Sequence, residues 1–263
     1  MRMKLFSGLV MAVAFGASAH AANLVQNGDF SSVTTSSASG SFEYDPAAPN
    51  NAGTVANWSV VNPGGQTSYN ILFKTSTATT GAPVTRFGTN TDQGLWALPS
   101  NTASMNIGTN FIALDGDTGA GGSNNVQGEL QQQITGLVAG QSYTLTFDFA
   151  AGQLQSRTGD TTEKLSVSMI GASGTQSFTT DTLSDTSKHA TDWKVETFTF
   201  TASDSTELLK FLSIGTPDGD PPMALLDNVS LTGVPEPASW GLMLVGVGAI
   251  GATLRRRRAL ALA

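Results

Sequence analysis

Alternation of apolar and polar residues is the feature that most restricts the fold of this chain. In the clearest run, the apolar residues are Tyr143, Leu145, Phe147 and Phe149, with Thr, Thr and Asp between them. Residues 165–169 repeat the pattern, and no segment between the two ends of the chain carries a convincing apolar repeat of 3.6 residues. A strand buried on one face has a period of two, so the pattern predicts an all-β protein.

About ten short strands separated by Gly, Ser and Asn turns predict one antiparallel β-sandwich, of jelly-roll type. A change of phase between Val195 and Phe198 predicts a β-bulge there. Polar connections that suit binding are expected at 31–41, 75–82 and 116–125. The predicted strands are Asn23–Phe30, Asn57–Val61, Tyr69–Phe73, Asn110–Leu114, Glu129–Thr135, Tyr143–Phe149, Leu165–Met169, Trp193–Phe200, Leu208–Ile214 and Ala224–Thr232.

The N-terminal residues have the three parts of a secretory signal. Arg2 and Lys4 precede an apolar run of about a dozen residues, which is too short to cross a bilayer. Ala19 and Ala21 then give the small-x-small pattern that signal peptidase cleaves. We therefore predict a signal helix in residues 1–21, cleavage after Ala21, and a mature domain over residues 22–233.

Residues 234–263 form a distinct C-terminal tail. The motif Pro235-Glu236-Pro237 precedes an apolar stretch, 238–254, which as a helix spans roughly 26 Å, the lower limit for a membrane crossing. A basic cluster at the end of this helix predicts a cytoplasmic end by the positive-inside rule. Its members are Arg255, Arg256, Arg257 and Arg258. These features predict a transmembrane helix that anchors the chain in the inner membrane.

This tail resembles the PEP-CTERM sorting signal, in which Pro-Glu-Pro, a short apolar helix and an arginine cluster follow one another at the C-terminus. The resemblance implies a Gram-negative bacterium that makes exopolysaccharide, and processing by an exosortase near Pro-Glu-Pro. It implies export, transient anchoring in the inner membrane, and a final place at the cell surface or outside the cell. The resemblance predicts the destination of the protein and not its activity.

Composition excludes several kinds of function. The predicted mature domain has 7 basic and 19 acidic residues, so binding to nucleic acid is not expected. The chain has no cysteine, which excludes disulfides, thiolate metal sites and cysteine nucleophiles. His189 is the one histidine of the mature domain, lies in a turn-rich stretch, and is expected to be an exposed loop residue.

The two terminal strands of the domain resemble the opening and closing strands of galactose-binding-like jelly rolls. The segments are Asn23–Phe30, which contains Asn27-Gly28-Asp29, and Leu225–Leu231, which contains Asp227-Asn228. Segments around Trp58, 137–147 and Trp193–Phe200 follow in the order seen in that group. Carbohydrate-binding modules and DUF642-like exported proteins use this fold, so the resemblance implies the fold for most of residues 23–231.

Asp227 is the acidic residue whose position is most informative about a metal site. Alternation places it on the same strand face as Leu225, Val229 and Leu231, so it is expected to point inward. A buried carboxylate needs a cation or several donors. Relatives in the resembling group often hold a structural calcium here, joined by the residue after the opening Phe, which is Ser31 in this chain; Asp29 substitutes if its strand bends. The alternative is that Asp227 accepts hydrogen bonds from backbone amides.

Two further segments place carboxylates two residues apart beside glycine. These are Asp115-Gly116-Asp117 and Asp218-Gly219-Asp220. Such spacing brings oxygens together on a hard cation such as calcium where the chain turns sharply. Asp-Gly pairs are also ordinary turn formers, and neither segment completes an EF-hand. Asp115 and Asp117 are therefore candidate calcium ligands, with a plain turn as the alternative.

Aromatic side chains are the usual platforms for sugar rings. Trp96 lies in an expected loop and is the first candidate, with Tyr69 and Tyr44 as further ones. The alternative for Trp96 is that its ring folds under its own loop. Trp58 and Trp193 lie in predicted strands and are expected to pack in the core or at an edge.

We expect an exported, non-catalytic β-sandwich at the cell envelope or in the extracellular matrix, with polysaccharide binding as the specific hypothesis. One alternative is a purely structural matrix or surface component. Another is a glycan hydrolase that uses acidic residues, although no nucleophile elbow, phosphate loop or His-Glu metal signature is present.

Overall fold

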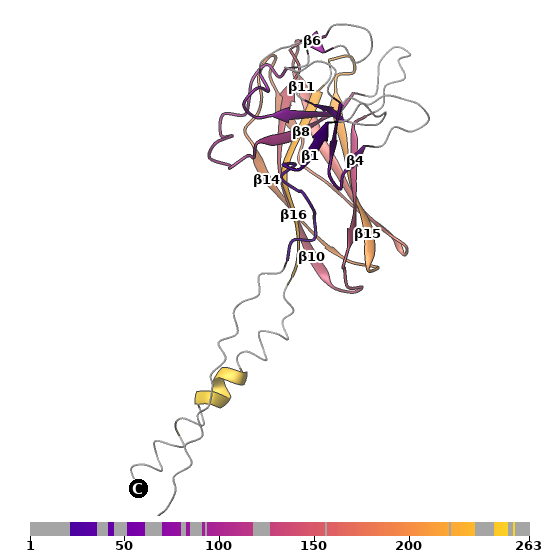
Figure 1. The fold of residues 1–263 in the computed structure, drawn as a ribbon, viewed down its shortest axis with the longest axis vertical. Helices are drawn as coiled ribbons and strands as arrows, with labels where there is room; N and C mark the ends of the chain where they lie inside the picture. Colours follow the sequence, from indigo (N-terminus) through magenta and orange to yellow (C-terminus); the bar gives the residue numbers. More distant parts are fainter. Residues whose placement is uncertain are drawn as a thin grey trace, which may run out of the picture.

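Two β-sheets packed face to face make up the body of the protein, and a C-terminal tail leaves from one end (Figure 1). The computed structural model of the 263-residue chain describes residues 22–35, 42–44, 52–60, 70–79, 83–84, 91–92, 94–117, 127–155, 157–220, 222–234, 245–251 and 255. The predicted all-β sandwich is confirmed for this part of the chain, and the strands in it outnumber the ten that the sequence predicts.

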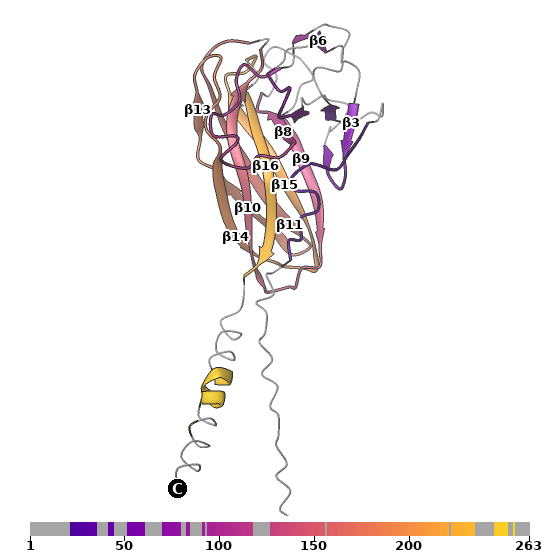
Figure 2. The same ribbon diagram turned by 60° about the vertical axis from the view of Figure 1, so that its left-hand side comes forward.

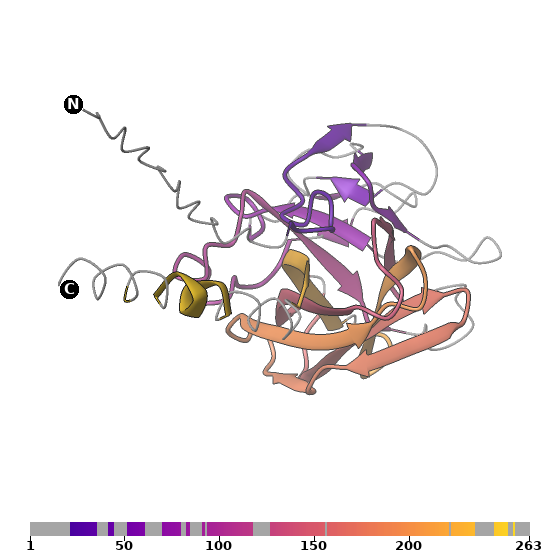
Figure 3. The same ribbon diagram turned by 90° about the horizontal axis from the view of Figure 1, so that it is seen from below.

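The larger sheet has eight strands. Their order is β1 (Val33–Thr35), β3 (Ala52–Val55), β2 (Phe42–Tyr44), β5 (Asn70–Lys74), β8 (Asn110–Asp115), β16 (Pro222–Gly233), β10 (Ser142–Gln153) and β14 (Lys194–Thr201). All neighbours are antiparallel except β2 and β5. Seen from below, the purple strands of the N-terminal third gather on one side of the molecule (Figure 3). The long central strands, β10 and β16, carry most of the pairing of this sheet.

The smaller sheet has six strands and is wholly antiparallel. Their order is β12 (Gly174–Thr179), β11 (Thr161–Gly171), β15 (Thr206–Thr216), β9 (Glu129–Thr135) and β4 (Ser59–Val60), with β13 (Leu183–Asp185) paired to β11. A separate pair consists of β6 (Pro83–Val84) and β7 (Thr91–Asp92). Figure 2 shows the long strands of the two sheets in their two layers.

The main core fills the space between the sheets. It follows the alternation of the sequence: Leu145 and Phe147 of β10 and Leu165 of β11 are 0 to 1% exposed. Phe211 of β15 packs edge-on against Phe147 with ring centroids 5.1 Å apart and also contacts Trp58. Burial of these large rings is the main stabilising contribution at the centre of the sandwich.

A second core lies on the outer face of the larger sheet. There β5, β8, β10 and β16 present apolar side chains such as Phe73 and Phe111 to the segment 94–109. Trp193, just before β14, belongs to this cluster: its ring packs edge-on against Phe111, and its Nε1 donates to Thr102 Oγ1 at 3.1 Å. The second core fixes the segment 94–109 onto the sheet, so this segment is held in place over its length.

The predicted first strand, Asn23–Phe30, is wrong: these residues form bends and turns. Asn27 and Phe30 have φ values of 54° and 50°, in the left-handed region, which a strand does not allow. The segment still runs beside β16, because Leu24 N donates to Leu231 O at 2.9 Å and Val229 N donates to Gly28 O at 2.9 Å.

The predicted bulge between Val195 and Phe198 is also wrong, since β14 pairs with β10 in continuous register. The irregularity lies in β16, where the register against β10 shifts next to Asn228, whose φ is 52°. This extra residue reverses the phase of the strand. Asp227 therefore lies on the face of Leu225, towards the second core, and not on the face of Val229 and Leu231 as predicted.

Both ends of the chain extend largely beyond the described residues. The signal residues Ala19 and Ala21 and the sorting residues Pro235, Glu236, Pro237, Arg256, Arg257 and Arg258 are outside them. Residues 245–251 and Arg255 are helical. Within the described part, no helix has the length and apolar character needed to span a membrane, so the predicted span 238–254 stays a prediction.

Candidate functional site at the loop end of the sandwich

Several buried acidic side chains gather at one end of the sandwich. At this end β8, β10 and β15 finish, and β11 and β16 begin. We call it the loop end; it lies opposite the end from which the tail leaves (Figure 1). Gln153 in β10 pairs with Pro222 in β16 here, whereas Tyr143 pairs with Gly233 at the tail end. Trp96, Asp115 and Asp117 lie at the loop end, whereas Asp227, Asp29 and Ser31 lie at the bulge in β16.

Trp96 lies at the loop end and is half-buried. Its backbone N donates to Gln153 O at 3.0 Å, and its ring Nε1 donates to Arg157 O at 2.6 Å. The ammonium of Lys188 lies 4.9 Å from the ring centroid, a cation–π contact. The indole is therefore held in one orientation, with part of its surface open to solvent and the Lys188 ammonium next to it.

The other aromatic candidates are less informative. Tyr44 is in β2, where it pairs with Leu72 of β5, and its side chain is outside what the structure describes. Tyr69 lies outside the described residues. Trp58 and Trp193 are 7% and 3% exposed, so the expectation that they pack in the core is confirmed.

His189 is also at the loop end, and its side chain is 63% exposed, as expected for a loop histidine. Its Nδ1 lies 3.3 Å from Asp185 Oδ1. Burial raises the pKa of Asp185, and the contact with His189 opposes that rise. The pair joins β13 to the following turn, which supports a structural role for this histidine.

Asp115 and Asp117 come together where β8 ends. The backbone N of Asp117 donates to Asp115 Oδ1 at 2.9 Å, which is the turn predicted for an Asp-Gly segment. Both residues are buried, at 1% and 5% exposed. Burial raises the pKa of Asp115 to about 8, and the neighbouring charge of Asp117 adds to the effect.

Glu163 of β11 is the acidic residue of this region that the sequence analysis missed. It is 0% exposed, and its Oε2 accepts from Ser213 Oγ at 3.2 Å. Burial, followed by the charge of Asp115, holds the pKa of Glu163 well above its usual value. The signal was present in the sequence, because Glu163 is in phase with Leu165 and Val167 on the inward face of the strand.

Asp227 occupies a second buried position, beside the bulge in β16. It is 0% exposed; Oδ2 accepts from Gly108 N at 2.9 Å, and Oδ1 has no hydrogen-bond partner among the described residues. Burial raises its pKa to about 7, with smaller contributions from Asp148 and Asp29. A Cβ on Gly108 would lie 3.5 Å from Asp29 O, 3.7 Å from Asn110 O and 3.7 Å from Asp227 Oδ2, so these three oxygens surround one small space.

The side chains of Asp29 and Ser31 lie at the rim of this position. Asp29 Oδ1 accepts from the backbone N of Ser31 at 3.3 Å and from its Oγ at 2.9 Å, and both residues are exposed. Asp29 thus offers its main-chain oxygen to the space beside Asp227, while its carboxylate bonds to Ser31.

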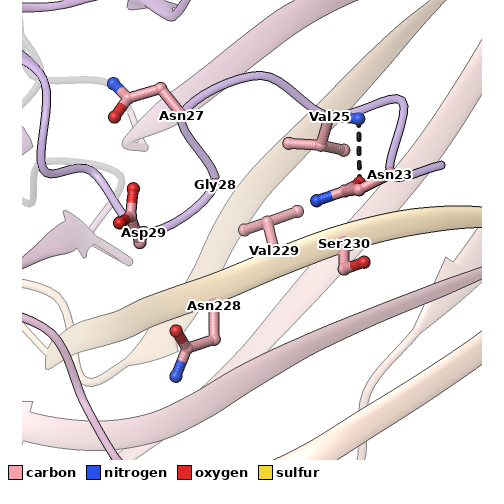
Figure 4. Close-up of a pocket in the computed structure, with 8 residues that line it drawn as sticks. All are labelled: Asn23, Val25, Asn27, Gly28, Asp29, Asn228, Val229 and Ser230. Atoms are coloured by element: carbon pink, nitrogen blue, oxygen red, sulfur yellow. Dashed lines mark hydrogen bonds between the residues drawn. The ribbon is translucent and has the colours of Figure 1, made fainter.

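A groove of about 380 Å³ lies between the N-terminal segment and β16. Figure 4 shows Asn228, Val229 and Ser230 on one side and residues from Asn23 to Asp29 on the other. The amides of this groove have structural partners: Asn23 Oδ1 accepts from Leu231 N at 2.8 Å, and Asn228 Nδ2 donates to Asp148 Oδ2 at 2.7 Å. The first bond holds the N-terminal segment against β16, and the second joins β16 to β10 at the bulge.

Comparison with known proteins places most of the chain in a family. Residues 23–232 match the family model described as "Protein of unknown function (DUF642)". The chain belongs to the DUF642 family. The residues after this DUF642 domain, 233–258, match the PEP-CTERM protein-sorting motif. The recognition of both segments from the sequence is confirmed.

A curated relative is Halomucin of Haloquadratum walsbyi, which is 28% identical to this DUF642 chain over 250 residues. The match covers 94% of the chain but 2% of Halomucin, so the chain corresponds to a small part of that protein.

Three of the solved structures similar to this chain are carbohydrate-binding domains. TmCBM61, solved in complex with β-1,4-galactotriose, has a TM-score of 0.42 at 12% identity and covers 81% of this chain and 99% of its own. The xylan-binding CBM22-1 domain from Paenibacillus barcinonensis has a TM-score of 0.38 at 12% identity, covering 84% and 99%. A CBM4 domain has a TM-score of 0.38 at 15% identity, covering 80% and 99%.

Proposed function

We propose that this protein binds polysaccharide without catalysis at the cell surface or in the extracellular matrix. In this proposal signal peptidase removes residues 1–21, and the tail anchors the chain in the inner membrane until an exosortase processes it near Pro235-Glu236-Pro237. The PEP-CTERM match supports the sorting steps. The DUF642 domain, in which acidic residues outnumber basic ones, is the part that meets the ligand.

The observation that carries the binding proposal is the fixed, partly open indole of Trp96. Its two hydrogen bonds, to Gln153 O and Arg157 O, set the ring orientation before any ligand arrives. A preorganised aromatic ring loses little conformational entropy on binding, and its apolar face suits the C–H face of a sugar ring. Lys188 adds N–H donors beside the ring for sugar hydroxyl or carboxylate oxygens.

The arrangement of carboxylates favours binding over hydrolysis. Glycoside hydrolysis needs two carboxyl groups that reach the same glycosidic bond. The paired carboxylates of the loop end, Asp115 and Glu163, are 1% and 0% exposed, so neither can touch a sugar in this conformation. Neither family model that matches the chain describes a catalytic family.

Binding to a panel of envelope and matrix polysaccharides, followed by affinity measurement, tests the proposal. Trp96→Ala is expected to weaken binding roughly 10- to 30-fold, as for a central aromatic contact. Trp96→Phe keeps a ring and is expected to lose less. Val195→Ala is the control, because Val195 is 60% exposed on β14, away from the loop end. No binding to any glycan, or equal binding by Trp96→Ala, would contradict the proposal and favour a purely structural role.

We further propose that Asp227 holds a structural calcium ion. The donors that fit are the carboxylate of Asp227, whose Oδ2 adjoins the space and whose Oδ1 is unpartnered, and the main-chain oxygens of Asp29 and Asn110. All are oxygens, which calcium prefers, and calcium would supply the positive charge that the buried carboxylate lacks. The ion would fasten the N-terminal segment to the bulge in β16 and so stabilise the fold; it takes no part in the binding of sugar.

A further inference from the structure

Two Asp-Gly-Asp segments that are about 100 residues apart in the sequence meet at the loop end. Gly219 N donates to Asp117 Oδ2 at 2.8 Å, which joins the turn after β15 to the end of β8. Asp218 lies close enough to Asp115 for its charge to act on that carboxylate. The structure thus assembles carboxylates that the sequence presents as two unrelated turns.

Glu163, in β11, joins these carboxylates from a third strand. Its Oε1 is buried and has no hydrogen-bond partner among the described residues. A Cβ on Gly116 would lie 2.6 Å from this oxygen, and a Cβ on Gly215 would overlap it. Because neither glycine has a side chain, Glu163 Oε1 can occupy the space between them. The hydrogen bond from Gly215 N to Gly116 O, at 3.0 Å, joins the two sheets beside it.

We call Asp115, Asp117, Glu163 and Asp218 the acidic end cluster. Arg157 is the basic side chain whose charge acts on Asp115, and its Nε donates to Gly219 O at 2.9 Å, on the side of the turn. Two almost fully buried carboxylates side by side are costly unless a cation or further donors compensate them. The unpartnered Oε1 of Glu163 shows that hydrogen bonds do not complete this compensation in the part of the chain that the structure describes.

We propose that the acidic end cluster is a divalent-cation site, with calcium as its ion. Asp115 and Glu163 are the inner ligands, and the exposed Asp218 adds negative charge beside them. Among the described residues, no three Asp, Glu or His side chains already stand as a ligand set, so main-chain oxygens and water complete the shell. Calcium accepts six to eight oxygens in irregular geometry, whereas magnesium demands a near-ideal octahedron.

This site is distinct from the one at Asp227. Asp227 lies at the bulge in β16 beside Gly108, whereas Asp115 pairs with Met223 near the start of β16. The proposal is also independent of polysaccharide binding, because the cation is held by the protein alone. The three proposals are polysaccharide binding, calcium at Asp227 and calcium at the acidic end cluster. Each can therefore be refuted without the others.

Calcium titration of the purified chain, by calorimetry and by thermal unfolding at pH 7.5, tests the site without any glycan. For the wild type we expect Tm to rise by about 5 °C at a calcium concentration of roughly 100 times Kd, and magnesium to do much less. Glu163→Gln keeps the shape and the bond with Ser213, and it is expected to weaken calcium binding at least roughly tenfold. Asp218→Asn removes the exposed charge beside the site and is expected to weaken calcium binding as well.

Asp227→Asn is the matched control, because it removes a buried carboxylate at the other position and is expected to leave binding at the acidic end cluster intact. The proposal is supported if Glu163→Gln and Asp218→Asn lose a calcium ion that Asp227→Asn retains. It is overturned if both variants bind calcium as the wild type does. It is equally overturned if calcium binding is absent, or is lost entirely in Asp227→Asn alone.

Discussion

Replacement of Asp227 by Asn measures how much free energy of unfolding is lost when the buried carboxyl group ionises. The side chain is 0% exposed, and in the folded protein its pKa lies at about 7, whereas the ordinary value is 3.8. The folded state therefore keeps a proton that the unfolded state has already lost. The raised pKa of Asp227 adds to the free energy of unfolding. This contribution is complete below about pH 4 and disappears as the pH rises towards 7.

The magnitude follows from the difference between the two pKa values. About three pKa units at 1.36 kcal/mol each correspond to about 4 kcal/mol. Asn cannot ionise, so Asp227→Asn lacks this pH dependence while its side-chain oxygen can still accept from Gly108 N. The free energy of unfolding of the variant, relative to the wild type, is expected to rise by about 4 kcal/mol between pH 4 and pH 8.

Urea unfolding in the presence of EDTA, at each pH unit from 4 to 8, measures this difference. EDTA is needed because a bound calcium ion would compensate the carboxylate and hide the effect. Asp181→Asn is the control, since Asp181 is exposed. A difference that stays constant across this pH range would show that Asp227 is already ionised in the folded protein, and the account of its burial would be refuted.

Other substitutions test the packing. Gly28→Ala would overlap the carbonyl oxygen of Val229 and is expected to lower the free energy of unfolding by roughly 2–4 kcal/mol, measured in urea. Gly108→Ala, whose Cβ has only contacts of 3.5 Å or more, is expected to change stability little in EDTA but to remove the calcium-dependent gain at Asp227; an unchanged gain would contradict calcium there. Phe211→Ala leaves a cavity at the centre of the sandwich and is expected to cost about 3–5 kcal/mol; a loss below about 1 kcal/mol would contradict its assigned place in the core.

The strands that the sequence predicted well are those with one buried face. In β10 and β11, Leu145 and Leu165 follow the period of two into the core, and the pattern is set by burial alone. The N-terminal segment was mispredicted because its apolar spacing resembles a strand, while the left-handed backbone at Asn27 and Phe30 is set by contacts with β16 and with the loop that follows. Single-residue dihedral choices of this kind depend on tertiary contacts and leave little trace in composition.

The candidate site was predicted in part. Trp96 was expected in a loop and lies there, and Asp115 and Asp117 form the expected turn. The face of Asp227 was wrong because one extra residue at Asn228 reverses the alternation, and no sequence pattern marked it. The meeting of Asp117 with Gly219 depends on the order of strands in the sheets, which local sequence does not specify.

The course of β16 has a mechanical consequence. The strand starts at the loop end, lies between β8 and β10, and leads directly into the tail at Val234. Its twelve residues span roughly 36 Å, so the loop end is held at about this distance from the point where the chain leaves the sandwich. Tension applied through the tail acts along the strand axis, across hydrogen bonds that lie perpendicular to it. These bonds are then loaded together in shear, and they resist extension as a set.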